Sequence, residues 1–199
     1  MKLYDISQEV FSCKVYPGDP KPEKQILCTM QKGDLYNLTA FSMCAHNGTH
    51  IDAPFHFIGD GKTVDQMDLN TFVGDCYVAR HTGDVTALNA LAILQRAEGI
   101  KRILIAGPAV VTEEAARVFA DSGICLLGNE SQTVGPENAP MQVHKMLLAK
   151  NVALLEGVAL TDVPEGRYFL SAAPLRLAGT DGAPCRAFLI ESNGADLNG

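Results

Sequence analysis

The chain has 199 residues, of which 47% are apolar and 20% are charged, a composition typical of a globular protein with an apolar core. Its formal net charge of −7 and the lack of any lysine or arginine run argue against a nucleic-acid partner, because phosphate binding requires a basic surface. No stretch resembles a signal peptide or a membrane span, so we expect a cytoplasmic protein with no membrane partner, folded as a single domain over residues 1–199.

The first part of the chain is predicted to be rich in strands and turns. Residues 2–7 alternate between apolar and polar side chains, and "YPGDP" at residues 16–20 places Pro17 and Gly18 in turn-forming order. Three further stretches have the composition of strands: residues 25–31, 38–45 and 74–81.

From residue 86 onwards the apolar residues recur with helical spacing. This spacing predicts helices over residues 86–100, 112–123 and 139–151, the second of them capped by Thr112. The apolar runs between and after these helices are predicted to be strands: residues 102–111, 124–131, 152–160, 167–179 and 186–193. A turn over residues 179–184 joins the last two. The pattern indicates a mixed α/β or α+β domain whose first part is rich in strands.

The six cysteines are scattered and form no C-x-x-C pair. A disulfide framework would be unusual in a chain of this length without a secretory signal, so we expect buried, reduced thiols. Cys44 lies two residues before His46 and could approach a metal, but a buried thiol is the expected role for it as well.

The stretch "HNGTHIDAPFHF" at residues 46–57 contains three of the five histidines in the chain. His46, His50, Asp52 and His56 all have even numbers, so on an extended chain their side chains lie on one face. A helix fits this set less well, because a proline in its interior would break it.

A straight strand cannot bring this set to one point, because it would separate His46 from His50 by roughly 13 Å. The chain must therefore curl, and Gly48 and Pro54 stand where a curl is needed. Imidazole and carboxylate together suit zinc, or manganese and iron less specifically. The alternative is a group of hydrogen-bonded structural histidines near a turn.

Further ligands are expected from the second half of the chain. Glu156 interrupts the apolar run "VALLEGVAL", and a buried carboxylate is costly unless it is paired or binds a metal. His144 lies in the third predicted helix and is a second candidate. His81 stands at the end of a predicted strand and is expected to face solvent.

The stretch at residues 46–57 resembles the H-x-G-T-H-x-D-x-P-x-H signature of the metal-dependent cyclase-like hydrolases, whose members include bacterial kynurenine formamidases. "VYPGDP" near the start, the twelve-residue step from His144 to Glu156, and "LLEGVALTDVPEGRYFLSAAPLRLAGTDGAPCRAFL" near the end also fit this family. The resemblance implies a swivelling β/β/α domain that assembles as a homodimer or larger homo-oligomer.

The same resemblance implies a role for each residue of the cluster. His46, His50 and Asp52 are similar to the ligands of a first metal ion. Asp52 and Glu156 match carboxylates shared by two ions, with His144 completing the second. The expected ions are two zinc ions, with manganese as a possibility. His56 matches a general acid/base.

These parts predict the hydrolysis of a small amide, in which metal-activated water attacks the carbonyl group and His56 protonates the leaving nitrogen. Two positions depart from the family pattern. Tyr16 stands where the family has a tryptophan, and this tyrosine is expected to bind the substrate ring. Glu130 stands where the family has an aspartate. Two alternatives stay open. One is the hydrolysis or formation of a cyclic amide or lactone, as in isatin hydrolases or cyclases, and the other is a metal-binding domain without turnover.

Overall fold

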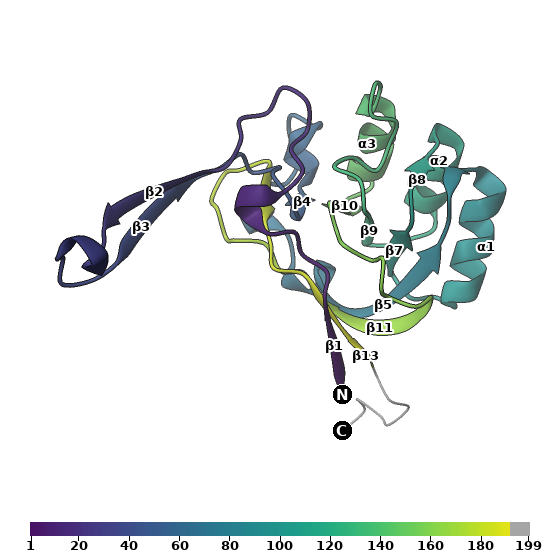
Figure 1. Cartoon of the computed structure of the whole chain (residues 1–199). Coiled ribbons are helices and arrows are strands. Elements are labelled where there is room, and N and C mark those ends of the chain that lie inside the picture. Colours follow the sequence, from purple (N-terminus) through teal and green to yellow (C-terminus); the bar gives the residue numbers. More distant parts are fainter. Residues whose placement is uncertain (192–199) are drawn as a thin grey trace.

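The computed structural model describes residues 1–191, in which nine strands form one curled, mixed sheet (Figure 1). In spatial order the strands are β1 (Lys2–Asp5), β13 (Phe188–Glu191), β11 (Gly166–Ser171), β5 (Val73–Arg80), β7 (Arg102–Ala106), β9 (Leu126–Asn129), β10 (Ala153–Glu156), β4 (His50–Asp52) and β12 (Gly182–Pro184). The four strands from β5 to β10 are parallel, and the remaining pairs are antiparallel. The predicted mixed α/β class is confirmed.

Three helices pack on one face of the parallel strands: α1 (Ala87–Ala97), α2 (Glu113–Asp121) and α3 (Met141–Leu148) (Figure 1). Each predicted helix is present, with shorter ends than the apolar periodicity indicated. The predicted cap of α2 is confirmed, because the Thr112 hydroxyl accepts a hydrogen bond from the Ala115 N–H at 3.2 Å.

Both faces of the parallel strands are buried, which explains their nearly continuous apolar sequences. Ile103 and Ile105 of β7 pack in the core beneath the helices, whereas Leu104 and Ala106 pack in a second core on the opposite face. Loops and short 3-10 helices cover that second core. These helices include η3 (Pro54–His56), η4 (Val64–Gln66) and η5 (Leu69–Thr71).

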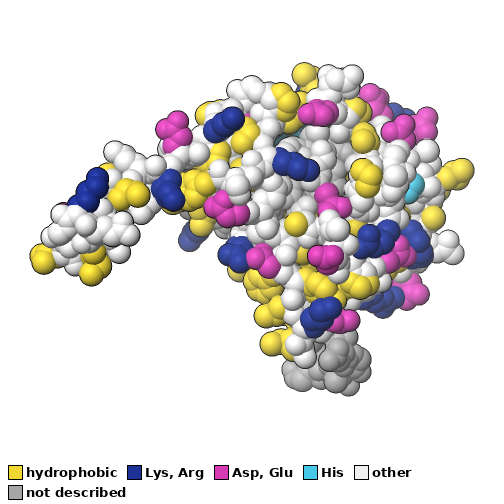
Figure 2. All heavy atoms as spheres, in the orientation of Figure 1, with side chains coloured by type: hydrophobic (Ala, Val, Ile, Leu, Met, Phe, Trp, Pro, Cys, Tyr) yellow, Lys and Arg dark blue, Asp and Glu magenta, His cyan; other side chains and the backbone are white. Residues whose placement is uncertain are grey.

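A two-stranded hairpin projects from the body of the protein, and we call it the arm (residues 23–42) (Figures 1 and 2). It consists of β2 (Glu23–Cys28) and β3 (Leu38–Ser42), joined through the 3-10 helix η2 (Met30–Lys32). Its apolar side chains face outward, and Leu35 is 93% exposed. Another short helix, η1 (Val10–Ser12), precedes it.

Residues 102–111 form two strands, whereas the sequence predicted one. Gly107 has a left-handed backbone with φ of 103°, which ends β7 and turns the chain. The residues that follow form β8 (Ala109–Val111), which pairs with β6 (Gly83–Val85) in a separate two-stranded sheet.

The end of the chain also differs from the prediction. The strand predicted over residues 167–179 ends at Ser171, and the predicted turn over residues 179–184 contains the edge strand β12. Pro184 is tolerated there because an edge strand needs fewer backbone donors. Residues 192–193 of the last predicted strand lie outside the described residues.

The six cysteines all lie within residues 1–191, and all are free thiols, as predicted. The prediction that they are buried holds fully for Cys76 alone, and the other five are partly exposed. None of the helices within this part of the chain is both long enough and apolar enough to cross a membrane.

Candidate metal centre

Strand β4 is the centre of the site because it lies between two partner strands. Glu156 of β10 stands directly opposite His50, while Gly182 of β12 stands opposite Asp52. Neighbours of this kind share one face of the sheet, so the pairing alone brings His50, Asp52 and Glu156 together.

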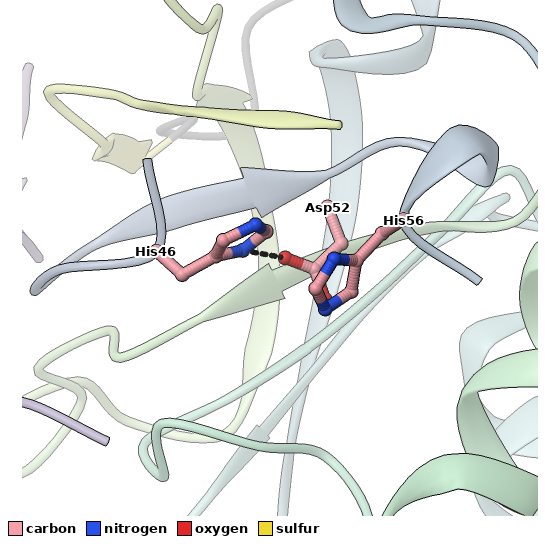
Figure 3. A group of neighbouring side chains, drawn as sticks. All are labelled: His46, Asp52 and His56. Atoms are coloured by element: carbon pink, nitrogen blue, oxygen red, sulfur yellow. Dashed lines mark hydrogen bonds and ion pairs between the residues drawn. The ribbon is translucent and has the colours of Figure 1, made fainter. Parts of the chain in front are cut away.

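The predicted curl is confirmed on both sides of β4. Gly48 has a left-handed backbone with φ of 64°, and Pro54 begins the 3-10 helix η3. Within residues 46–57 only residues 50–52 form a strand, so the bends rather than a long strand carry His46 and His56 towards Asp52. Figure 3 shows these three side chains pointing towards one another.

The side chains that the sequence singled out converge on Asp52. Nδ1 of His46 lies 2.8 Å from Asp52 Oδ1, and Nε2 of His50 lies 3.2 Å from the same oxygen. Helix α3 brings in His144, whose Nε2 lies 3.1 Å from Glu156 Oε1 and 3.5 Å from Asp52 Oδ2. Five of the predicted residues therefore form one cluster.

Two histidines are oriented with Nε2 towards the cluster. Nδ1–H of His50 donates to the Gly48 carbonyl at 2.9 Å, and Nδ1–H of His144 donates to the Pro140 carbonyl at 2.9 Å. A backbone acceptor of this kind fixes the ring and leaves the other nitrogen available, which is the usual arrangement of a metal-binding histidine.

The two carboxylates at the centre are almost completely buried, Asp52 at 1% and Glu156 at 2% exposure. Within residues 1–191 neither forms an ion pair with a lysine or an arginine, and their charged partners are histidines. Buried carboxylates without such partners require other positive charge, which divalent ions supply.

In the protein without metal, protons on the histidines compensate this negative charge. Burial alone would lower the pKa of His50 and His144. Hydrogen bonds to Asp52 and Glu156 outweigh it for His50, and the hydrogen bond to Glu156 with the charges of Glu156 and Asp52 outweighs it for His144, so both pKa values rise to about 9. Burial would raise the pKa of Asp52, yet hydrogen bonds from His46 and His50 hold it well below its usual range.

Potential ligand atoms form two groups that share Asp52, and within each group the atoms lie within 4.8 Å of one another. One contains His50, Asp52 and Glu156, and the other contains His46, Asp52 and His56. Imidazole nitrogen and carboxylate oxygen are donors that zinc and similar ions accept. The cluster therefore fits a divalent metal ion, and His56 lies within reach of it.

A cavity of about 240 Å³ opens beside the cluster, and its wall includes the ring of Tyr16. The Tyr16 hydroxyl donates to the Glu137 carbonyl at 2.7 Å, which holds the ring in place. Gln132 and Thr133 also line the cavity, and their buried side-chain polar atoms have no hydrogen-bond partner among residues 1–191. These atoms are available to a bound molecule.

Asp181 is a site residue that the sequence did not reveal. Its Oδ2 lies 2.8 Å from Nε2 of His46 and 3.0 Å from Nδ1 of His56. Burial would lower the pKa of His46, but hydrogen bonds to Asp181 and Asp52 raise it to about 11. The bond from His46 in turn outweighs burial and lowers the pKa of Asp181.

Three other residues discussed from the sequence lie outside the cluster. The Glu130 carboxylate accepts the backbone N–H groups of Gly107 at 2.5 Å and Leu160 at 2.8 Å, so it joins two loops. Cys44 Sγ lies 3.9 Å from an Asp19 oxygen and belongs to neither ligand group. His81 is only half-exposed, because its Nε2 lies 3.0 Å from the Asp84 carbonyl.

Comparisons with known proteins show which family the chain is similar to. A family model described as "Putative cyclase" matches residues 4–112. The kynurenine formamidase of Erythrobacter litoralis (strain HTCC2594) is 32% identical over 204 residues, which cover 96% of this chain and 94% of that protein.

Solved structures give the same picture. A potential metal-dependent hydrolase with cyclase activity is 31% identical, with a TM-score of 0.79 and coverage of 94% of this chain and 96% of its own. Isatin hydrolase A from Labrenzia aggregata has a TM-score of 0.81 at 20% identity, with coverage of 96% and 94%, a likeness that extends to the fold alone.

Proposed function

The chain belongs to the cyclase family of metal-dependent hydrolases, as its histidine-rich signature predicted, and from this premise we propose that it hydrolyses N-formylkynurenine to kynurenine and formate. It is an enzyme of the amidohydrolase type that uses a divalent metal. The finer proposal concerns the substrate, the number of ions and the part that each residue takes.

The observation that carries the proposal is the convergence of three histidines on two buried carboxylates beside a cavity. We propose that His46, His50 and Asp52 hold one ion, and that Asp52, Glu156 and His144 hold another. The ions are expected to be zinc, with manganese as the alternative. When bound, such ions lower the pKa of a water molecule and polarise the substrate carbonyl.

Cleavage of a formamide needs a proton donor as well. Water adds to the carbonyl carbon, the C–N bond breaks, formate leaves and the nitrogen takes a proton, because an amine is a poor leaving group until it is protonated. The ring of His56 lies beside the ligands, with its centroid 4.1 Å from that of His46. We assign the proton transfer to His56.

The substrate is supported by the cavity wall and by the relatives. Tyr16 is held at the wall by its bond to Glu137, and a tyrosine ring can stack on the aniline ring of N-formylkynurenine. Kynurenine formamidases align over nearly the whole chain at about a third identity.

We also propose that the protein is a homodimer or larger homo-oligomer in the cytoplasm. The outward-facing apolar side chains of the arm support self-association, because monomers rarely expose such surfaces. Six free thiols support a reducing compartment. Analytical ultracentrifugation of the wild type and of Leu35→Ser tests the first part, and a wild type that sediments as a monomer would contradict it.

The direct test of the substrate is a side-by-side assay. Protein loaded with zinc or with manganese is incubated with N-formylkynurenine, isatin and a simple lactone. The proposal expects the highest kcat/KM with N-formylkynurenine. Turnover confined to isatin or the lactone would transfer the assignment to a cyclic substrate, and no turnover with any of them would support a binding domain.

The division of roles is tested with three histidine variants. His56→Ala is expected to retain metal and lose activity, whereas His50→Ala is expected to lose both. His81→Ala is the matched control because its ring lies outside the cluster, and it should retain both. Equal loss of metal in His56→Ala and His50→Ala would contradict the proton-transfer role of His56.

A further inference from the structure

We propose that Asp181 is a positioning residue that fixes the ring of His56 and the ring of His46 through one carboxylate oxygen. This inference rests on the proposed function insofar as His56 is taken to transfer the proton. It adds a residue from the far end of the chain to a site otherwise built from residues 46–56, His144 and Glu156.

The geometry places a single acceptor between two rings. Oδ2 of Asp181 lies 3.0 Å from Nδ1 of His56 and 2.8 Å from Nε2 of His46. The other nitrogen of His46, Nδ1, lies 2.8 Å from Asp52 Oδ1. A continuous chain of polar contacts therefore runs from the central carboxylate of Asp52, through His46 and Asp181, to His56.

The backbone around Asp181 is anchored to the same elements that carry the histidines. Its carbonyl accepts the N–H of Ala53 at 2.9 Å, and the carbonyl of Thr180 accepts the N–H of Val64 at 3.0 Å. The next residue, Gly182, begins β12 and pairs with Asp52 of β4. The carboxylate is therefore held in a fixed place relative to both rings before any substrate arrives.

The hydrogen bond to Asp181 determines which nitrogen of His56 carries a proton and which one faces the substrate. Nδ1–H donates to the carboxylate, and within residues 1–191 no protein group bonds to Nε2. Nε2 is therefore the nitrogen left to exchange a proton with a substrate. A carboxylate on the far side of a histidine typically fixes both its tautomer and its ring orientation.

The contact to His46 gives the same residue a second effect. If Nδ1 of His46 faces a metal ion, Nε2–H donates to Asp181, and loss of such an outer partner weakens metal binding by about 10- to 100-fold. Zinc affinity therefore reports on Asp181 independently of turnover.

The experiment compares Asp181→Ala and Asp181→Asn with the wild type as zinc-loaded full-length proteins. Long-range ¹H–¹⁵N spectra read the tautomer of each histidine, and the His56 signals are assigned from their loss in His56→Ala. The wild type is expected to show the Nδ1–H tautomer of His56. Asp181→Ala should lose this preference, and Asp181→Asn, which keeps one carbonyl acceptor, should restore part of it.

At saturating zinc, kcat of Asp181→Ala is expected to fall by about 10- to 100-fold with KM within about threefold of the wild type. Asp65→Asn is the control for loop placement, because Asp65 accepts the N–H of Gly179 at 2.9 Å and, in the part of the chain that the structure describes, forms no hydrogen bond or ion pair with a histidine. It should leave both the His56 tautomer and kcat near wild-type values.

Three results would overturn the inference: an unchanged His56 tautomer in Asp181→Ala, a changed tautomer without a fall in kcat, or equal effects of Asp65→Asn. The tautomer and the zinc affinity are measured without substrate. A wild type that turns over none of the tested substrates would therefore refute the proposed function while these two readings still decide on the contacts of Asp181.

Discussion

The substitution Gly182→Ala should disturb the metal centre by a purely steric route. A Cβ atom at this position would lie 2.8 Å from Cε1 and 3.3 Å from Nδ1 of His46, and 2.7 Å from the carbonyl oxygen of Ile51. His46 cannot simply turn away, because both ring nitrogens are engaged, one with Asp52 and one with Asp181. The ring must therefore move at the expense of these contacts.

The expected size follows from these overlaps. Overpacking at a well-packed position costs about 1–3 kcal/mol, which corresponds to a fall in Tm of about 2–12 °C for a chain of this length. Displacement of His46 should also weaken zinc binding by about 10- to 100-fold. Gly59→Ala is the matched control, because Gly59 has no positive φ and its added Cβ would meet no atom of the described residues within 4 Å.

Two measurements check this prediction. Thermal unfolding in the presence of a chelator gives the loss of stability, and a competition titration against a zinc chelator gives the affinity. Zinc affinity in Gly182→Ala equal to that of Gly59→Ala, despite a lower Tm, would refute the view that the ring of His46 must rest on Gly182 to bind metal.

Three further predictions concern the metal ligands and the core. In the metal-free protein the pKa of His46 is raised to about 11 and those of His50 and His144 to about 9, so all three rings are protonated at about pH 7.5. Zinc binding by these three histidines should therefore release about three protons and strengthen as the pH rises. Calorimetry in buffers of different ionisation enthalpy measures this release, and a buffer-independent enthalpy would contradict it. Glu156→Gln keeps an acceptor for the backbone N–H of Val134 but removes the charge of a ligand. Zinc affinity measured by chelator competition should therefore fall by more than about 100-fold, and a smaller loss would exclude Glu156 as a ligand. Phe119→Ala, at a fully buried position of α2, should lower the free energy of unfolding of the metal-free protein in urea by about 3–5 kcal/mol. The zinc affinity of the folded protein should stay unchanged. A weakened affinity would show that the helical core sets the ligand geometry.

The cluster itself could be predicted because its chemistry is local in sequence. The histidines and the aspartate of residues 46–57 occupy one short stretch, and Glu156 stands out as a charge in an apolar strand. The curl at Gly48 and Pro54 follows from the distance that a straight strand would impose.

The parts that could not be predicted depend on contacts between distant residues. Strand β4 is only three residues long, and it exists because β10 and β12 pair with its two edges. Asp181 stands in "GTDG", a sequence typical of a turn, and its partners His46 and His56 lie 135 and 125 residues away. No local pattern in the sequence carries that information.

The most direct test of the central claim is anomalous diffraction at the zinc edge from crystals of the zinc-loaded protein. The account predicts two zinc ions at ligand distances of about 2.0–2.2 Å, one among His46, His50 and Asp52 and the other among Asp52, His144 and Glu156. Zinc bound elsewhere on the protein, or no anomalous signal among these side chains, would contradict it.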